Sequence, residues 1–246
     1  MRRREEFVFS PGTKIPNHIA IIPDGNRRWA RAKRLPILEG HRKGFNVALD
    51  LARACRDFGV YTLSFWAFST DNWTRSKEEV SYLMKLYETM IDRVLKEALK
   101  DGVKIIHLGR KDRISERLAE KIEKAEVETK DLKKYIFNLA LDYGGKDEIL
   151  RAIRRIQDTG YRIQDLNEEN FNDFLDTAGQ PYPYPDLLIR TSGEQRTSGL
   201  LPWQMAYTEF YFVKKHFPDM TKQDIYEAIL DYNNRERRFG GDSKNA

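Results

Sequence analysis

The chain has 246 residues, 40% of them hydrophobic, and a formal net charge of +5, which suits one large α/β domain or two small ones with a buried core. The basic surplus fits phosphate-bearing ligands, nucleic acid or an anionic membrane surface without choosing among them. A single cysteine, Cys55, excludes an intramolecular disulfide and a cysteine-rich zinc site, and no apolar run approaches ~18 residues, so we expect a cytoplasmic protein whose membrane contact, if any, is peripheral.

Residues 1–17 are polar and punctuated by prolines, which predicts a flexible N-terminal arm. The uncharged run 19–22 predicts a buried strand, and the sequence Pro23-Asp24-Gly25-Asn26 behind it predicts a tight turn into a helix. The free N–H groups at a helix amino terminus attract anions, and a carboxylate there serves an anionic ligand only through a bridging cation such as Mg²⁺. Alternatively, Asp24 and Asn26 only shape the turn and cap the helix.

A helix is predicted from Gly40 to about Phe58, with His41 in its first turn, where the imidazole is either a phosphate contact or a surface residue. The next predicted strand, residues 61–68, ends in the polar cluster 69–75. Two strands then deliver polar groups to one rim of an α/β sheet, which favours Ser69 and Asn72 as site residues. Glu79 completes the pattern of a capping box with Ser76, so it serves either the helix or a ligand.

The helix predicted from Val80 to Ala98 has a wide apolar arc, because Leu86 and Met90 lie on the flank of its main stripe. Such a helix either packs in an ordinary core or lines a cavity for a hydrocarbon chain. Strands are predicted at 103–108 and 135–141, and helices at 114–129 and 146–157.

A second polar cluster spans residues 185–199, where a strand ends in an arginine and a loop of hydroxyls and glycines follows. Arg190, Arg196 and Ser198 together could clamp a diphosphate, whereas the alternative is a solvated loop. Glu209 begins the next predicted strand and is a candidate second carboxylate for a metal. A helix from Thr221 to about Arg237 closes the fold.

In this order and spacing the motifs resemble those of the cis-prenyltransferases, isoprenyl transferases of the undecaprenyl diphosphate synthase type. The segments that carry the resemblance are 24–30, 40–41, 68–75, 138–145, 190–196 and 209–212. The resemblance implies a single α/β catalytic domain over residues 18–241, followed by a tail at 242–246. It implies a central six-stranded, mostly parallel sheet wrapped by helices, with a hydrophobic tunnel between the sheet and two helices. It also implies a homodimer, in which the motif 238–240 reaches across to the partner.

The implied reaction condenses isopentenyl diphosphate, with cis geometry, onto an allylic diphosphate such as farnesyl diphosphate. Catalytic roles fall on Asp24, which would hold Mg²⁺ and assist departure of the allylic diphosphate, and on Asn72, at the position assigned to proton removal. Asp24 and Glu209 would form the metal site. Substrate-binding roles fall on Gly25, Asn26, Arg27, Arg28, Trp29, His41, Ser69, Thr70, Asp71, Trp73, Arg75, Arg190, Arg196, Thr197 and Ser198.

Ile37 stands where many family members carry an arginine, so one phosphate contact is missing or is supplied by Arg34. Two other classes compete with the enzyme. A non-catalytic partner subunit of a prenyltransferase could have lost the carboxylates and arginines that this chain retains. A phosphate- or nucleic-acid-binding module would interleave basic and exposed aromatic residues along one face. Product length and the preferred primer stay open.

Overall fold

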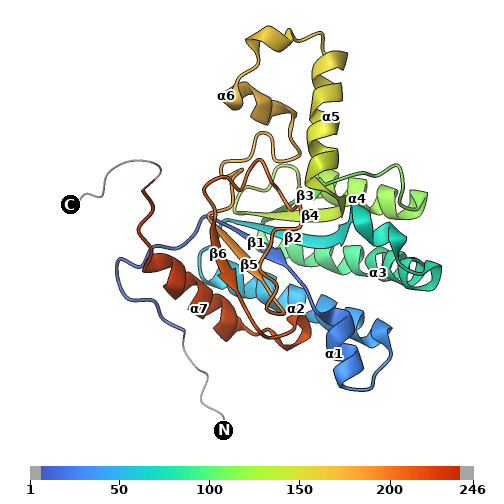
Figure 1. Cartoon of the computed structure of the whole chain (residues 1–246), viewed down its shortest axis with the longest axis vertical. Coiled ribbons are helices and arrows are strands. Elements are labelled where there is room, and N and C mark those ends of the chain that lie inside the picture. The colour runs from blue at the N-terminus through green and yellow to red at the C-terminus, as the bar shows by residue number, and fades with distance from the viewer. Residues whose placement is uncertain (1–6, 239–246) are drawn as a thin grey trace.

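Six apolar segments form one sheet in the computed structural model, which describes residues 7–238 (Figure 1). The strands are β1 (His18–Ile22), β2 (Thr62–Ser69), β3 (Val103–Leu108), β4 (Tyr135–Tyr143), β5 (Leu187–Arg190) and β6 (Glu209–Phe212). Their order across the sheet is β3-β4-β2-β1-β5-β6, and every neighbouring pair is parallel. The predicted six-stranded, single-domain α/β fold is therefore confirmed.

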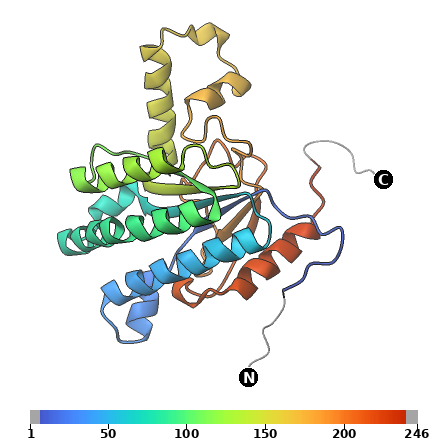
Figure 2. The same ribbon diagram turned by 180° about the vertical axis from the view of Figure 1, so that it is seen from behind.

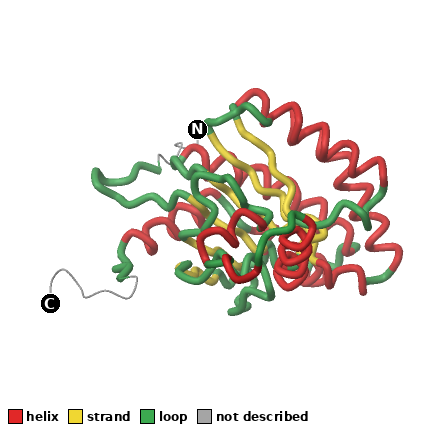
Figure 3. Tube along the Cα trace, turned by 90° about the horizontal axis from the view of Figure 1, so that it is seen from above, coloured by secondary structure: helices red, strands yellow, loops and turns green. Residues whose placement is uncertain are grey.

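Helices lie outside the strands in the view from above (Figure 3), and most of them pack on one face of the sheet. They are α1 (Asn26–Ala32), α2 (Ile37–Asp57), α3 (Lys77–Asp101), α4 (Glu116–Thr129), α5 (Gly145–Asp158), α6 (Glu168–Phe171) and α7 (Lys222–Asn233). Figure 2 shows α2, α3, α4 and α7 crossing one face, where their apolar residues cover Ile19, Leu63 and Ile105. On the other face the loop residues Leu200, Leu201 and Met205 cover Ala20 and Ala140, and α5 protrudes beside α6 (Figure 1).

The start of α2 differs from the prediction. The helix begins at Ile37, three residues before Gly40, because Pro36 at the N-cap already has the extended backbone that admits a helix start. His41 therefore lies in the second turn of α2, and the prediction that it lies in the first turn was wrong.

Residues 7–17 contain no helix or strand, yet Phe7, Phe9 and Ile15 pack against the core beneath α2 and α7. Phe9 stacks on Tyr226 at 4.7 Å between ring centroids and meets Phe58 edge-on. Residues 1–6 of the predicted arm, most of the tail motif and the segment 242–246 lie outside the described residues.

The strand order decides which loops meet. Because β2, β1 and β5 are neighbours and parallel, their carboxyl ends share one edge of the sheet. The turn after β1, the cluster after β2 and the loop after β5 therefore converge there, as Asp24, Asn72 and Arg190 require for a common site.

Candidate active site

Asp24 and Gly25 form a turn that is clamped against the loops after β5 and β6. The carbonyl oxygen of Asp24 accepts hydrogen bonds from the Phe217 N–H (3.0 Å), the Thr191 hydroxyl (2.7 Å) and the Ser192 hydroxyl (2.9 Å). Gly25 has φ 102°, and a Cβ there would lie 2.0 Å from the Ser192 Oγ. Only glycine fits this position, because the backbone is left-handed and there is no room for a side chain.

Two arginines hold the Asp24 carboxylate, one from each side. Arg190 Nη2 donates to Oδ2 at 3.0 Å, and Arg28 Nη2 donates to Oδ1 at 3.1 Å. Burial alone would raise the pKa of this carboxyl, but the hydrogen bonds and charges of Arg190 and Arg28 outweigh burial and hold the pKa below its ordinary value. Asp24 is therefore ionised at neutral pH, as a cation-binding carboxylate must be.

The two arginines of the loop after β5 occupy different surroundings. Arg190 is buried, and its Nη1 donates to the Ser198 Oγ (2.8 Å) and to the Arg196 carbonyl oxygen. The guanidinium of Arg196 is exposed and pairs with Glu194, which also accepts from Arg28 at 2.7 Å. Arg190 thus joins Asp24 to Ser198, while Arg196 lies at the solvent side of the loop.

A second charged group centres on Glu79, which is 7% exposed. Its Oε1 accepts from Arg75 Nη1 (3.0 Å) and contacts His41 Nε2 (3.0 Å), and its Oε2 lies 3.6 Å from Arg27 Nε. Burial is the largest influence on His41 and lowers its pKa, so the imidazole is neutral at pH 7 and donates to Glu79. The Ser76 hydroxyl still caps α3 through the Glu79 N–H, but the Glu79 side chain serves the site.

These groups surround two adjoining pockets. The mouth pocket lies at the carboxyl edge and is lined by Asp24, Asn26, His41, Ser69, Asp71, Asn72, Arg75, Leu86, Arg190 and Ser198, among others. A basic recess beside it, which we call the arginine corner, is lined by residues 23–28 with Arg31, His41 and Arg75. Three polar atoms of this region, Asn26 Oδ1, Arg27 Nε and Arg190 Nε, are buried without a hydrogen-bond partner among residues 7–238. Buried polar atoms without partners are rare, and their residues line the pockets: Asn26 and Arg190 the mouth pocket, and Asn26 and Arg27 the arginine corner.

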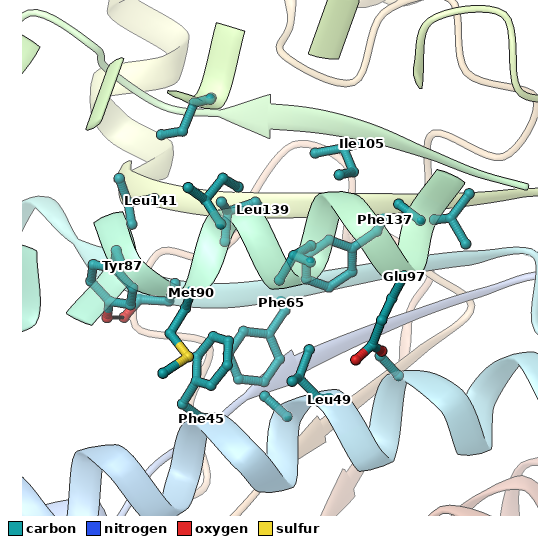
Figure 4. Close-up of a pocket in the computed structure, with 18 of the residues that line it drawn as sticks. Phe45, Leu49, Phe65, Tyr87, Met90, Glu97, Ile105, Phe137, Leu139 and Leu141 are labelled. Atoms are coloured by element: carbon teal, nitrogen blue, oxygen red, sulfur yellow. Dashed lines mark hydrogen bonds between the residues drawn. The ribbon is translucent and has the colours of Figure 1, made fainter. Parts of the chain in front are cut away.

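An apolar pocket continues from the mouth pocket between the sheet, α2 and α3 (Figure 4). Phe45, Phe65, Ala67 and Tyr87 line both pockets. Figure 4 shows Met90 of α3 pointing toward Phe45 of α2, with Leu49 and Glu97 farther along the same helices. The wide apolar arc of α3 therefore faces a cavity at Met90 and the mouth pocket at Leu86.

Several predicted site residues point away from these pockets. Trp29 is buried and donates to Asp219 at 2.7 Å, and Thr70 packs beside Gly144. Trp73 donates to Asp142 at 2.7 Å and meets Phe68 edge-on, so it braces the loop after β2. Thr197, like these three residues, is absent from the lining of the pockets described above. The oxygen of Asn72 accepts the Ser69 N–H, so this side chain also shapes the loop.

Glu209 does not share a metal site with Asp24 of the same chain, which corrects the predicted pair. Glu209 is level with Leu187 on β5, and Leu187 with Ile19 on β1, whereas Asp24 follows the other end of β1. From the level of Ile19 to the end of β1 is three residues, ~10 Å at ~3.3 Å per residue, and β6 is two strands from β1, about 10 Å across the sheet. Arg235 pairs with Glu209 at 2.8 Å instead.

The residues at the carboxyl edge nevertheless fit a magnesium ion that shares its ligands with a phosphate. Asp24 supplies one ionised carboxylate and Asn26 an unsatisfied oxygen, which are ligand types that Mg²⁺ accepts. Residues 7–238 hold no cluster of three or more His, Cys, Asp or Glu side chains suited to a metal. An ion here would therefore depend on ligand oxygens and water.

Comparison with known proteins identifies the family. Residues 22–240 match the family model described as "Putative undecaprenyl diphosphate synthase". The chain belongs to this family of prenyltransferases. The isoprenyl transferase of Aquifex aeolicus is 44% identical over 92% of this chain and 96% of its own, and that of Clostridium perfringens is 44% identical over 93% and 91%. This protein is accordingly a transferase.

Solved structures of the family share the fold. A lavandulyl diphosphate synthase from Lavandula x intermedia, in complex with dimethylallyl diphosphate, matches with a TM-score of 0.88 and 38% identity, covering 92% of this chain and 98% of that one. A probable undecaprenyl diphosphate synthase from Campylobacter jejuni matches with a TM-score of 0.76 and 32% identity, covering 92% and 99%.

Two residues that support the site of this prenyltransferase through its neighbouring side chains were not predicted from sequence. Glu194 bridges Arg28 and Arg196, and its only signal is that it is the one acid in the loop of residues 191–199. Asp142 is fully buried with φ 52° and binds both Trp73 and Arg113. An aspartate before Tyr-Gly-Gly tolerates this left-handed backbone, which was the available clue. Arg34 is exposed and lines none of the pockets described, so it does not replace the contact missing at Ile37.

Proposed function

We propose that this prenyltransferase condenses isopentenyl diphosphate with an allylic diphosphate, farnesyl diphosphate as the primer, and forms a longer polyprenyl diphosphate with cis geometry. The observation that carries the proposal is the junction of a charged mouth pocket with an apolar pocket through Phe45, Phe65, Ala67 and Tyr87. One end suits a diphosphate and the other a hydrocarbon. The site does not favour the alternative of a non-catalytic partner subunit, because Asp24 is present and bonded to Arg28 and Arg190.

The allylic diphosphate is assigned to the arginine corner. Arg27 and Arg28, the α1 amino terminus and the buried Asn26 Oδ1 are close together there, and the lavandulyl diphosphate synthase holds an allylic diphosphate within the same fold. A magnesium ion held by Asp24 would neutralise charge on the departing diphosphate. Helix N–H groups and arginines add donors aimed at the same developing charge.

Isopentenyl diphosphate is assigned to the side of Asp24 that Arg190 occupies. Arg190 and Ser198 line the mouth pocket, and Arg196 is near them at the solvent side. In the reaction the allylic C–O bond breaks and diphosphate departs, and the terminal alkene carbon of isopentenyl diphosphate forms the new C–C bond. The CH2 group next to the resulting cationic carbon then loses a proton, which the departed diphosphate can accept. Asn72, Ser69 and Arg75 line the mouth pocket near this step, and orientation of the CH2 group for proton removal is assigned to the Asn72 position.

The growing chain is assigned to the apolar pocket, which would form the hydrophobic tunnel. The pocket is enclosed by α2, α3 and strands β2, β3 and β4, with Arg56 and Glu97 among the residues farthest along the helices. Hydrocarbon that enters past Tyr87 gains apolar contacts on every side, at about 25 cal/mol per Å² buried.

The test is incubation of the purified protein with radiolabelled isopentenyl diphosphate, Mg²⁺ and either farnesyl or dimethylallyl diphosphate, followed by chain-length and double-bond analysis. Labelled products longer than the primer, with new cis double bonds, are expected with farnesyl diphosphate and not with the Asp24→Asn variant. Products with trans bonds, or no elongation with either primer, would refute the proposal.

We further infer a homodimer and a cytoplasmic protein whose membrane contact is peripheral. Within residues 7–238, β6 is an edge strand and Leu150, Ile153 and Phe210 are exposed, which offers apolar surface for a second copy. In a dimer, Glu209 and the 238–240 motif could reach the site of the second subunit. Light scattering should find twice the monomer mass. Within residues 7–238, no helix has the combined length and hydropathy that crossing a bilayer demands.

A further inference from the structure

The positive charge of the protein is concentrated in α1, its connection to α2 and the start of α2. Residues 28–43 contain six cationic side chains and one acid, so their surplus of five equals the +5 of the whole chain and the remaining sequence is balanced. Figures 1 and 2 place this connection at a corner of the molecule, away from α5 and α7. We call six exposed residues of this region that lie outside the pockets the basic crest: Lys33, Arg34, Leu35, Pro36, Arg42 and Lys43.

The basic crest is separate from the site. Its four cations are absent from the lining of the mouth pocket and the arginine corner, whereas Arg28 and Arg31 line that corner. Arg42 pairs with Glu39 of its own helix, and Lys33 lies 4.8 Å above the Trp29 ring. The proposed reaction therefore leaves these exposed cations without a role.

An apolar side chain lies among these cations. Leu35 is 42% exposed, and its N–H donates to the Ala30 carbonyl at 2.9 Å, so a closed turn presents it. Arg34 has φ 55°, which shapes that turn at some cost for a non-glycine residue. Ile37 and Leu38 follow and are partly exposed. Cations that flank an exposed leucine suit a surface with anionic head groups above hydrocarbon.

We propose that the basic crest docks the protein on an anionic phospholipid surface. Phosphate groups of a nucleic acid would engage the cations but give Leu35 no apolar partner, so the combination favours a bilayer. The purpose of the docking rests on the proposed function, because a polyprenyl diphosphate released from the arginine corner emerges beside the crest. Arg31, which lines that corner, lies two residues before Lys33. The lipid product would then pass from its site into the bilayer without crossing water.

Co-sedimentation of the full chain with phosphatidylcholine vesicles, with and without phosphatidylglycerol, tests the docking. Each Lys or Arg near such a surface contributes ~1 kcal/mol, about fivefold in affinity, so Lys33→Gln with Arg34→Gln should weaken binding about 25-fold. Leu35→Ser should weaken it at unchanged charge. Matched controls at the far edge of the sheet are Lys124→Gln with Lys130→Gln, and Val127→Ser, where Val127 is 63% exposed. Both control variants should bind as the parent does.

The vesicle assay is independent of turnover, so its failure and that of the proposed function can be told apart. Elongation of a soluble primer without vesicles should be equal in the parent and the crest variants, which also shows that they fold. Absence of binding to phosphatidylglycerol vesicles, or equal losses in crest and control variants, would overturn the docking. Tighter binding to duplex DNA that ignores Leu35→Ser would overturn it in favour of nucleic acid.

Discussion

Bulky residues along α3 should set product length in order of their depth in the apolar pocket. Met90, Val94 and Ala98 line this pocket on successive turns beyond Tyr87, which also lines the mouth. At ~1.5 Å per residue they are about 6 Å apart along the helix. Met90→Trp should therefore shorten the product most, Val94→Trp less, and Ala98→Phe least, while the rate of the first condensation changes little.

The cost in stability should separate a cavity wall from a packed core. Overpacking a core costs about 1–3 kcal/mol, which lowers Tm by about 2–4 °C per kcal/mol in a protein of this size. Leu95 on the same helix is buried in the core outside the pocket lining, so Leu95→Trp should show that loss. Met90→Trp should show less than 1 kcal/mol, roughly.

Chain-length analysis by thin-layer chromatography, with thermal unfolding of each variant, measures both effects. Equal product lengths in all three variants, or a Met90→Trp protein as destabilised as Leu95→Trp, would refute the assignment of this pocket to the growing chain.

Three further predictions concern charged groups. Asp24→Asn should lower kcat/KM about 10²- to 10³-fold, the range for one group that stabilises developing charge, with an unchanged urea midpoint; near-parental turnover in Mg²⁺ would contradict its role. Arg196→Lys should raise KM for isopentenyl diphosphate alone, whereas Arg190→Lys should affect both substrates, because Arg190 also holds Asp24; steady-state kinetics with each substrate varied would expose the opposite pattern. Burial lowers the pKa of His18 from 6.5 to about 4, so between these pH values the unfolded chain binds more protons than the folded chain. The free energy of unfolding therefore decreases as the pH is lowered, by about 2 kcal/mol at pH 5. Urea unfolding at pH 7 and pH 5 should show a smaller loss in His18→Asn, and identical losses would show that His18 is not the group responsible.

Local sequence determined the elements and the chemistry at their ends. The uncharged runs 19–22 and 187–189 became buried strand residues, because an α/β sheet covered on both faces admits apolar residues on each. Asp24-Gly25 became a turn into a helix, because glycine takes the left-handed backbone that the turn needs. Polar groups after parallel strands gather at one edge, so the turn at Asp24 and the cluster 69–75 could be placed at a common rim in advance.

Tertiary structure alone decided which way each candidate faces. Trp73 turns to Asp142, and Glu79 turns from its capping position to His41, because their partners come from elements 38 to 69 residues away in the chain. Glu209 looked like a partner for Asp24 because both adjoin strands, but Glu209 begins its strand and Asp24 follows one. Residue spacing records the distance along the chain, whereas strand order and register, which bring β1, β2 and β5 together and place Glu209 at the far edge, arise only when the strands pair.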